Sequence, residues 1–259
     1  LRLLQPPHSE AVAVAVAERP APPADEGVVA PVAPPARAAA ATEPPATPRP
    51  PAPAPVPVAP GALAGLDWPG LREAVAACRA CALCERRTQT VFGVGAAQAR
   101  WMVVGEAPGE QEDREGEPFV GAAGQLLDRM LAALQLTRAE DAGAPPERQV
   151  YIANTLKCRP PGNRNPTPDE LAKCEPFLVR QIELLRPRLI LAMGRFAVQA
   201  LLRTDEPIGK LRGRVHHYQG VPLVVTYHPA YLLRNLPEKA KAWDDLCLAA
   251  EVFERQSAA

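Results

Sequence analysis

The sequence has no surplus of charge of either sign. Its 29 Lys and Arg residues equal its 29 Asp and Glu residues, so the formal net charge is zero. A chain that binds nucleic acid as a bulk polycation is therefore excluded, and any such binding must rest on local basic clusters. The clusters present are Lys157-Arg159-Arg164, Lys210-Arg212-Arg214, and Arg234 with Lys239 and Lys241.

Long apolar runs are also missing. No stretch approaches the roughly 20 apolar residues that a membrane-spanning helix needs. Residues 11–17 (AVAVAVA) are too short for a span and have no basic flank, so no signal peptide is predicted there. We therefore expect no membrane association and a cytoplasmic location.

Residues 1–62 contain no aromatic residue, no Cys and no Met, but they hold 17 of the 32 prolines. Pro-Ala tracts such as PPAPAPVPVAP bury too little apolar surface to offset the entropy lost on ordering, and they favour extended polyproline II. We therefore predict a disordered Pro/Ala-rich extension or linker at 1–62. The remaining residues, 63–259, suffice for one domain with its own core.

Short apolar runs alternate with segments of helical periodicity in the folded part. Apolar runs predict strands at 101–104, 149–153, 188–192, 215–218 and 222–226. Helices are predicted around 71–75 and at 122–135, 168–185, 195–202 and 237–254, and Thr167 and Glu170 form a capping box before the third. This alternation predicts an α/β fold of three αβα layers with a mainly parallel central sheet.

The stretch Gly105–Gly124, GEAPGEQEDREGEPFVGAAG, follows the first predicted strand and precedes a helix. Ligands of open α/β sheets bind at the carboxyl ends of the strands, so we predict a ligand-binding loop here. A plain connector would not need so many acids and an aromatic residue. The candidate residues are Glu106, Glu110, Glu112, Asp113 and Phe119.

Six cysteines lie at positions 78, 81, 84, 158, 174 and 247. In a cytoplasmic chain this spacing favours a metal site over disulfides. Four thiolates suit zinc or a [4Fe–4S] cluster, and the spacing does not decide between the two. Nor does it decide which of Cys78, Cys81 and Cys84 is spare. Cys247, between two leucines of a predicted helix, is expected to be an ordinary buried thiol.

Four motifs occur in order along the folded part: CRAC, GEAPG…GEPFVGAAG, NTLKCRPPGNRNPTPDELAKC and HPAYLLRN. Together they resemble the family 4 uracil-DNA glycosylases, iron–sulfur enzymes of DNA repair, over about residues 76–248. The resemblance implies a uracil-DNA glycosylase-like fold and a hydrolase that cleaves the N-glycosidic bond of uracil in damaged DNA. Such a reaction leaves an abasic site for base excision repair.

The resemblance also implies a [4Fe–4S] cofactor and its ligands. The family's first cysteine pair precedes an RT…VFG segment, which here comprises Arg87-Thr88 and residues 91–93. That match implies four metal ligands, with Cys84 as an extra thiol: Cys78, Cys81, Cys158 and Cys174.

Roles in a base pocket follow from the same resemblance. Glu106 and Ala107 would hold uracil, Phe119 would stack on it, Asn154 would read its Watson–Crick edge, and His228 would contact O2. Family 1 enzymes carry an Asp where Ala107 stands, so the resemblance shifts catalysis to His228, which would stabilise the uracil anion as a donor. Glu106 is the second catalytic candidate, as a water-positioning or base-binding group, and Glu112 is a candidate for excluding the methyl group of thymine.

The HPAYLLRN motif is predicted to form a DNA-intercalating loop. Apolar side chains at a base step fill the gap that a flipped base leaves. The loop's predicted contacts are Tyr231, Leu232, Leu233 and Arg234, and phosphates would be held by Arg234, Lys157 and Arg164. The expected partner is uracil-containing DNA, single- or double-stranded, bound by a monomer at the nucleoid; the extension would bind an unknown partner.

Three other functions compete with this one. A non-catalytic zinc- or cluster-containing DNA-binding module would need the cysteines and basic clusters but not Asn154, Phe119 or His228. A nucleotide-binding enzyme is disfavoured, because the glycine-rich loop is acidic and lacks the lysine of a P-loop. A related glycosylase that traps DNA covalently is disfavoured too, because residues 159–173 contain no His.

Overall fold

The structure is a computed structural model that describes Gly61 and residues 63–140 and 143–257. Apart from Gly61, the predicted extension at 1–62 lies outside the described residues. Within them, no helix combines the length and hydropathy that crossing a bilayer requires.

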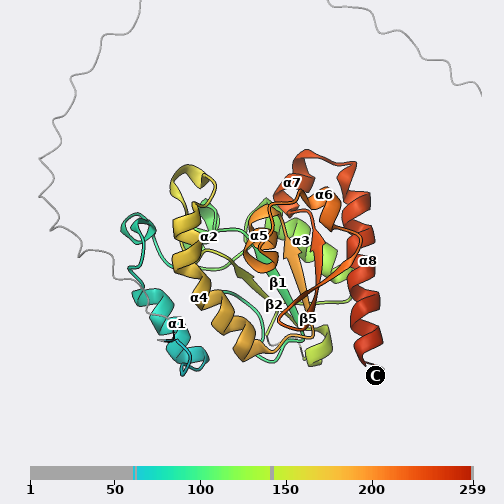
Figure 1. Cartoon of the computed structure of the whole chain (residues 1–259), viewed down its shortest axis with the longest axis horizontal. Coiled ribbons are helices and arrows are strands. Elements are labelled where there is room, and N and C mark those ends of the chain that lie inside the picture. The colour runs from blue at the N-terminus through green and yellow to red at the C-terminus, as the bar shows by residue number, and fades with distance from the viewer. Residues whose placement is uncertain (1–60, 62, 141–142, 258–259) are drawn as a thin grey trace, which may run out of the picture. The chain divides into compact units, whose positions relative to one another are not determined.

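The described residues form a five-stranded sheet in the order β2-β1-β3-β5-β4 (Figure 1). The pairs β1–β2, β1–β3 and β3–β5 are parallel, whereas β4 runs antiparallel to β5. The prediction of a mainly parallel sheet is therefore confirmed. The strands are β1 (Trp101–Gly105), β2 (Val150–Asn154), β3 (Leu189–Met193), β4 (Val215–Tyr218) and β5 (Val221–Thr226).

Every predicted helix is present, with ends that differ by a few residues from the expected ones. The capping box of the fourth helix is confirmed, because the Glu170 carboxylate accepts from the N–H of Thr167 and the Thr167 hydroxyl accepts from the N–H of Glu170. The helices are α1 (Trp68–Ala77), α2 (Glu110–Glu115), α3 (Ala122–Ala133), α4 (Pro168–Leu185), α5 (Arg195–Leu202), α6 (Ile208–Leu211), α7 (Pro229–Arg234) and α8 (Glu238–Ser257).

Helices cover the sheet on both faces, which confirms the three-layer arrangement. Side chains alternate along a strand, so Met102 and Val104 pack under α4 and α5, while Trp101 and Val103 pack under α3 and α8. Figure 1 shows α8 along one side of the sheet, with α4 and then α1 along the other. All five residues of β1, β2 and β3 are buried, as expected of parallel strands covered on both faces.

Two segments predicted as loops contain short helices instead. The stretch Gly105–Gly124 includes α2, whose first turn carries three carboxylates that favour a helix N-terminus. The predicted DNA-contact loop contains α7, which begins at Pro229 with His228 as its N-cap. Local capping stabilises both helices, and their apolar periodicity is too short to detect in the sequence. The one-turn helix α6 was likewise not predicted.

Candidate active site

A cleft of about 180 Å³ opens where β1, β2 and β5 end. Parallel strands place their carboxyl ends at one edge of the sheet, so residues distant in sequence meet here. Glu112, Asn163 and Arg164 are part of its wall. The cleft is also lined by every predicted substrate-binding residue: Glu106, Ala107, Phe119, Asn154 and His228.

Asn154 is the last residue of β2 and is only 2% exposed. Its Oδ1 is buried and has no hydrogen-bond partner among the described residues. A buried polar atom without a partner is costly, so this oxygen is a strong candidate for binding a ligand in the cleft. Gly105 makes room for it, because a Cβ at that position would lie 2.4 Å from Oδ1 and 2.7 Å from the Phe119 ring.

Phe119 adopts a left-handed backbone conformation, with φ of 56°, which is strained for an aromatic residue. Hydrogen bonds from Arg138 and close packing against Gly124 hold Phe119 in this conformation. The Arg138 guanidinium donates to the carbonyls of Pro118 and Phe119 at 2.9 and 3.0 Å, and it pairs with Asp128 at 2.8 Å. Gly124 allows the backbone of Phe119 to pack closely against α3, since a Cβ at position 124 would lie 1.7 Å from the Phe119 carbonyl oxygen.

His228 follows β5 and its imidazole stacks on Phe119, with ring centroids 5.3 Å apart and planes at 27°. Its Nδ1 accepts a hydrogen bond from the N–H of Ala230 at 3.2 Å, so this nitrogen carries no proton. Burial, assisted by the nearby Arg234 cation and opposed by the charge of Glu112, lowers the pKa of His228 to about 4. The ring is therefore neutral at pH 7, with its proton on Nε2.

The two carboxylates of the cleft differ in their surroundings. Glu112 accepts hydrogen bonds from the N–H groups of Gly109, Val120 and Gly121 at 3.0 to 3.3 Å, so it ties both ends of the loop together. Glu106 receives no hydrogen bond on its carboxylate from the described residues, and burial raises its pKa. Glu112 thus holds the backbone, whereas Glu106 is available to a ligand or water.

A second cavity beside the cleft is lined by five of the six cysteines. Arg87 donates to Cys158 Sγ at 3.2 Å, and the backbone N–H of Lys157 donates to Cys174 Sγ at 3.3 Å. Cys247 lies apart on α8 and is half-buried. The lining cysteines are Cys78, Cys81, Cys84, Cys158 and Cys174.

Burial raises the pKa of Cys158 to about 11 and that of Cys174 to about 12. Burial also raises the pKa of Cys81. Buried thiols of this kind become thiolates only beside a cation, and a metal supplies one. In residues 63–140 and 143–257, however, no three His, Cys, Asp or Glu side chains are drawn together as ligands of a single ion.

The chain is similar to known proteins over the region that contains the cleft. Residues 92–247 match the model of the uracil DNA glycosylase superfamily. The chain is 44% identical to a type-4 uracil-DNA glycosylase of Archaeoglobus fulgidus over 167 residues, 61% of this chain and 79% of the relative. The chain belongs to the type-4 uracil-DNA glycosylase family.

Two further members support this assignment. A type-4 uracil-DNA glycosylase of Pyrobaculum aerophilum is 39% identical over 193 residues, 71% of this chain and 93% of the relative. One of Thermotoga maritima is 43% identical over 165 residues, 63% of this chain and 81% of the relative. The matched region of the superfamily contains β1 to β5, and so it includes the whole cleft.

The structure separates the residues that the family resemblance placed against DNA. Tyr231 and Leu233 are 37% and 41% exposed, and Arg234 is exposed at the end of α7. Leu232 is only 1% exposed, so its side chain is part of the core and the prediction that it contacts DNA is wrong. The segment was predicted as a loop, but it forms the helix α7. Neighbouring residues of a helix point in different directions, so Leu232 turns inward while Leu233 turns outward.

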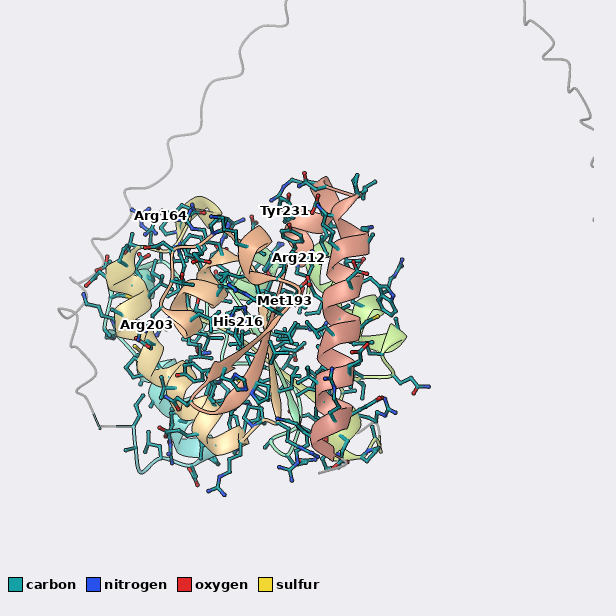
Figure 2. All side chains as sticks on the ribbon, turned by 45° about the vertical axis from the view of Figure 1, so that its right-hand side comes forward. Arg164, Met193, Arg203, Arg212, His216 and Tyr231 are labelled. Carbon is teal, nitrogen blue, oxygen red and sulfur yellow. The ribbon has the colours of Figure 1, made fainter. Side chains whose placement is uncertain are left out.

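Two cations predicted to hold phosphates are also placed differently. Lys157 is 2% exposed, so it does not reach a phosphate and that prediction is wrong. Arg164 is exposed but forms a bidentate pair with Glu170 at 2.6 and 2.9 Å. Figure 2 shows Arg164 and Tyr231 at the same end of the molecule.

Three residues of the glycosylase site escaped sequence reasoning. Arg138 donates to the carbonyl of Phe119 and so holds its backbone. Gly194 leaves room for His228, because a Cβ added at Gly194 would lie 3.0 Å from the His228 Cβ. Gln181 accepts a hydrogen bond from the buried Lys157. None of them is in the motifs that carried the family resemblance. Gly194, which follows a buried strand, was the only one with a local signal.

Proposed function

We propose that the cleft binds a uracil base flipped out of DNA and that this chain hydrolyses its N-glycosidic bond. The chain is a hydrolase of the uracil-DNA glycosylase family that acts in DNA repair. The observation that supports the proposal for the cleft is the buried, unpaired side-chain oxygen of Asn154. Its buried amide has an unpaired oxygen for the N3–H of uracil and an NH₂ group for O4. Cytosine presents the reverse pattern and would leave these groups unpaired.

His228 would stabilise the leaving group. Cleavage leaves negative charge on uracil O2, and a donor already in place stabilises the transition state more than the ground state. The hydrogen bond from Ala230 occupies Nδ1, so the proton of the neutral ring is on Nε2 and can be donated. The ring is neutral at pH 7, because burial lowers its pKa to about 4.

Glu106 would position the attacking water. Its carboxylate faces the same cleft as Asn154 and His228 and carries no hydrogen bond from the described residues. The neighbouring Ala107 offers no polar group, and Glu112 is already bonded to backbone N–H groups. Phe119, held beside His228, would stack on the base.

The cysteine cavity would hold a [4Fe–4S] cluster, bound through Cys78, Cys81, Cys158 and Cys174. All four line the cavity, as does Cys84, and the family resemblance is what leaves Cys84 as the extra thiol. In such a cluster each cysteine binds a different iron, so the ligands need not converge on one point, as they would around zinc. The cluster would cross-link the segment after α1 to the segments before and within α4.

DNA would lie against the exposed side of α7. Tyr231 and Leu233 offer apolar side chains for a base step, and Arg234 offers a charge for a phosphate. The proposed partner is uracil-containing DNA, single- or double-stranded. A monomer suffices for this site, because the cleft is complete within one chain. The protein would act in the cytoplasm, at the nucleoid.

The proposal is tested with oligonucleotides that carry uracil, cytosine or thymine at one position, without added metal or nucleotide. We expect release of uracil alone, and on the order of 100-fold slower release by Asn154→Ala with DNA binding retained. DNA binding without base release by the unmodified protein would instead favour a non-catalytic DNA-binding module. Equal rates for Asn154→Ala and the unmodified protein would remove Asn154 from base recognition.

A further inference from the structure

Lys157 lies between the cysteine site and the cleft. It precedes Cys158, lines the cysteine cavity, and donates its backbone N–H to Cys174 Sγ at 3.3 Å. Its side chain makes a different connection, because Nζ donates to the backbone carbonyl of Asn154 at 2.8 Å. One residue thus contacts both a cysteine of the metal site and the base-reading residue of the cleft.

The ammonium group of Lys157 belongs to a buried hydrogen-bond network with two acceptors, of which the Asn154 carbonyl is one. Nζ also donates to Gln181 Oε1 at 2.6 Å, and Gln181 Nε2 donates to the carbonyl of Phe92 at 2.9 Å. Gln181 is fully buried and its Nε2 also lies 3.3 Å from the hydroxyl of Tyr151. A buried cation is retained only where hydrogen bonds replace its water, so this network fixes the position of Nζ.

The direction of the Asn154 side chain depends on its backbone. Its Oδ1 has no hydrogen-bond partner among the described residues, so no side-chain bond through that oxygen orients the amide. The backbone beyond it is held by the N–H of Thr155, which donates to Gly105, and that of Leu156, which donates to Glu106. The Lys157 bond adds a contact to the carbonyl of Asn154 itself, and so it helps to fix the peptide plane that follows the Asn154 Cα.

We propose that Lys157 is a positioning residue that orients Asn154 for uracil and joins it to the cysteine site. This inference rests on the proposed role of Asn154 in the cleft. Lys157 contacts Cys174 through its backbone and Asn154 through its side chain, so the two contacts can be separated by substitution. Removing the ammonium should disturb base recognition but leave the metal site intact, because the bond to Cys174 comes from the backbone.

The test is a double-mutant cycle with Lys157→Met and Asn154→Ala, measured as single-turnover uracil release, iron content and visible absorption of the cluster. Met keeps the length and apolar stem of Lys without its donors. Tyr151→Phe is the matched control, since it perturbs the same buried network without touching Asn154. Lys157→Gln, which keeps a shorter donor, is the second variant, and all rates are measured where circular dichroism shows folded protein.

We expect Lys157→Met to lower the single-turnover rate constant by about tenfold or more, with unchanged iron, and by less than about threefold in the Asn154→Ala background. Lys157→Gln should retain part of the activity, and Tyr151→Phe nearly all of it. Equal losses in both backgrounds, loss of iron, or failure of both Lys157 variants to fold would overturn the inference. An unmodified protein that releases no uracil would overturn the proposed function itself.

Discussion

The imidazole of His228 stacks on the ring of Phe119, with centroids 5.3 Å apart. His228 follows the carboxyl end of β5, and Phe119 lies near the end of the loop that follows β1. The position of each residue requires a glycine beside it. Gly124 admits the left-handed turn at Phe119, and Gly194 admits the Cβ of His228. This stacked pair buries the imidazole and keeps it neutral, with one nitrogen bonded to Ala230 and the other available.

Replacement of His228 by Ala should slow uracil release by about 10² to 10³, the usual cost of removing one donor to a developing anion. The loss should lie in kcat, because the bond to O2 strengthens as charge develops. His217→Ala is the control, since His217 is exposed on β4. Near-normal single-turnover rates for His228→Ala would remove this residue from catalysis.

The neutrality of His228 predicts how stability responds to pH. The folded pKa is about 4 and the ordinary value is 6.5, so between these values the unfolded chain binds more protons. The free energy of unfolding should therefore fall as the pH falls from about 6.5 towards 4, by about 3 kcal/mol in total.

The measurement is urea unfolding at several pH values for the unmodified protein and for His228→Gln, in which this part of the pH dependence should vanish. Arg234→Ala should weaken the effect, because the Arg234 charge helps to lower the pKa. Identical pH profiles for the unmodified protein and His228→Gln would show that the folded and unfolded pKa values of His228 do not differ.

Serine substitutions should separate the cysteines into two groups. Cys78→Ser, Cys81→Ser, Cys158→Ser and Cys174→Ser should each lower the iron content from about four per chain and bleach the yellow-brown colour. Cys84→Ser and Cys247→Ser should keep both. A colourless protein with one zinc would reject the cluster, and loss of iron in Cys84→Ser would place Cys84 among the ligands.

Leu233 and Leu232 should differ despite being neighbours. Leu233→Ala should reduce uracil release from double-stranded DNA more than from single-stranded DNA, with little change in stability, because Leu233 is 41% exposed. Leu232→Ala should cost about 2–5 kcal/mol in unfolding free energy, since its side chain is buried. Val215→Ala is the control for loss of an exposed apolar side chain. Equal strand preference in Leu233→Ala and Val215→Ala would argue against the wedge.

Sequence patterns predicted most of the fold because they are local. Apolar runs marked the strands within one or two residues, and Thr167 with Glu170 marked the start of α4. The pocket residues were found through motifs, and the cleft brings Glu106, Ala107, Phe119, Asn154 and His228 together as predicted.

Burial and pairing were decided only by the tertiary structure. A lysine in a basic cluster and a leucine in an apolar motif look the same in sequence whether they face solvent or the core. Here Gln181 and the carbonyl of Asn154 take up the Lys157 ammonium, and the turn of α7 directs Leu232 inward. These positions depend on contacts between segments far apart in the chain, and no local pattern of residues encodes such contacts.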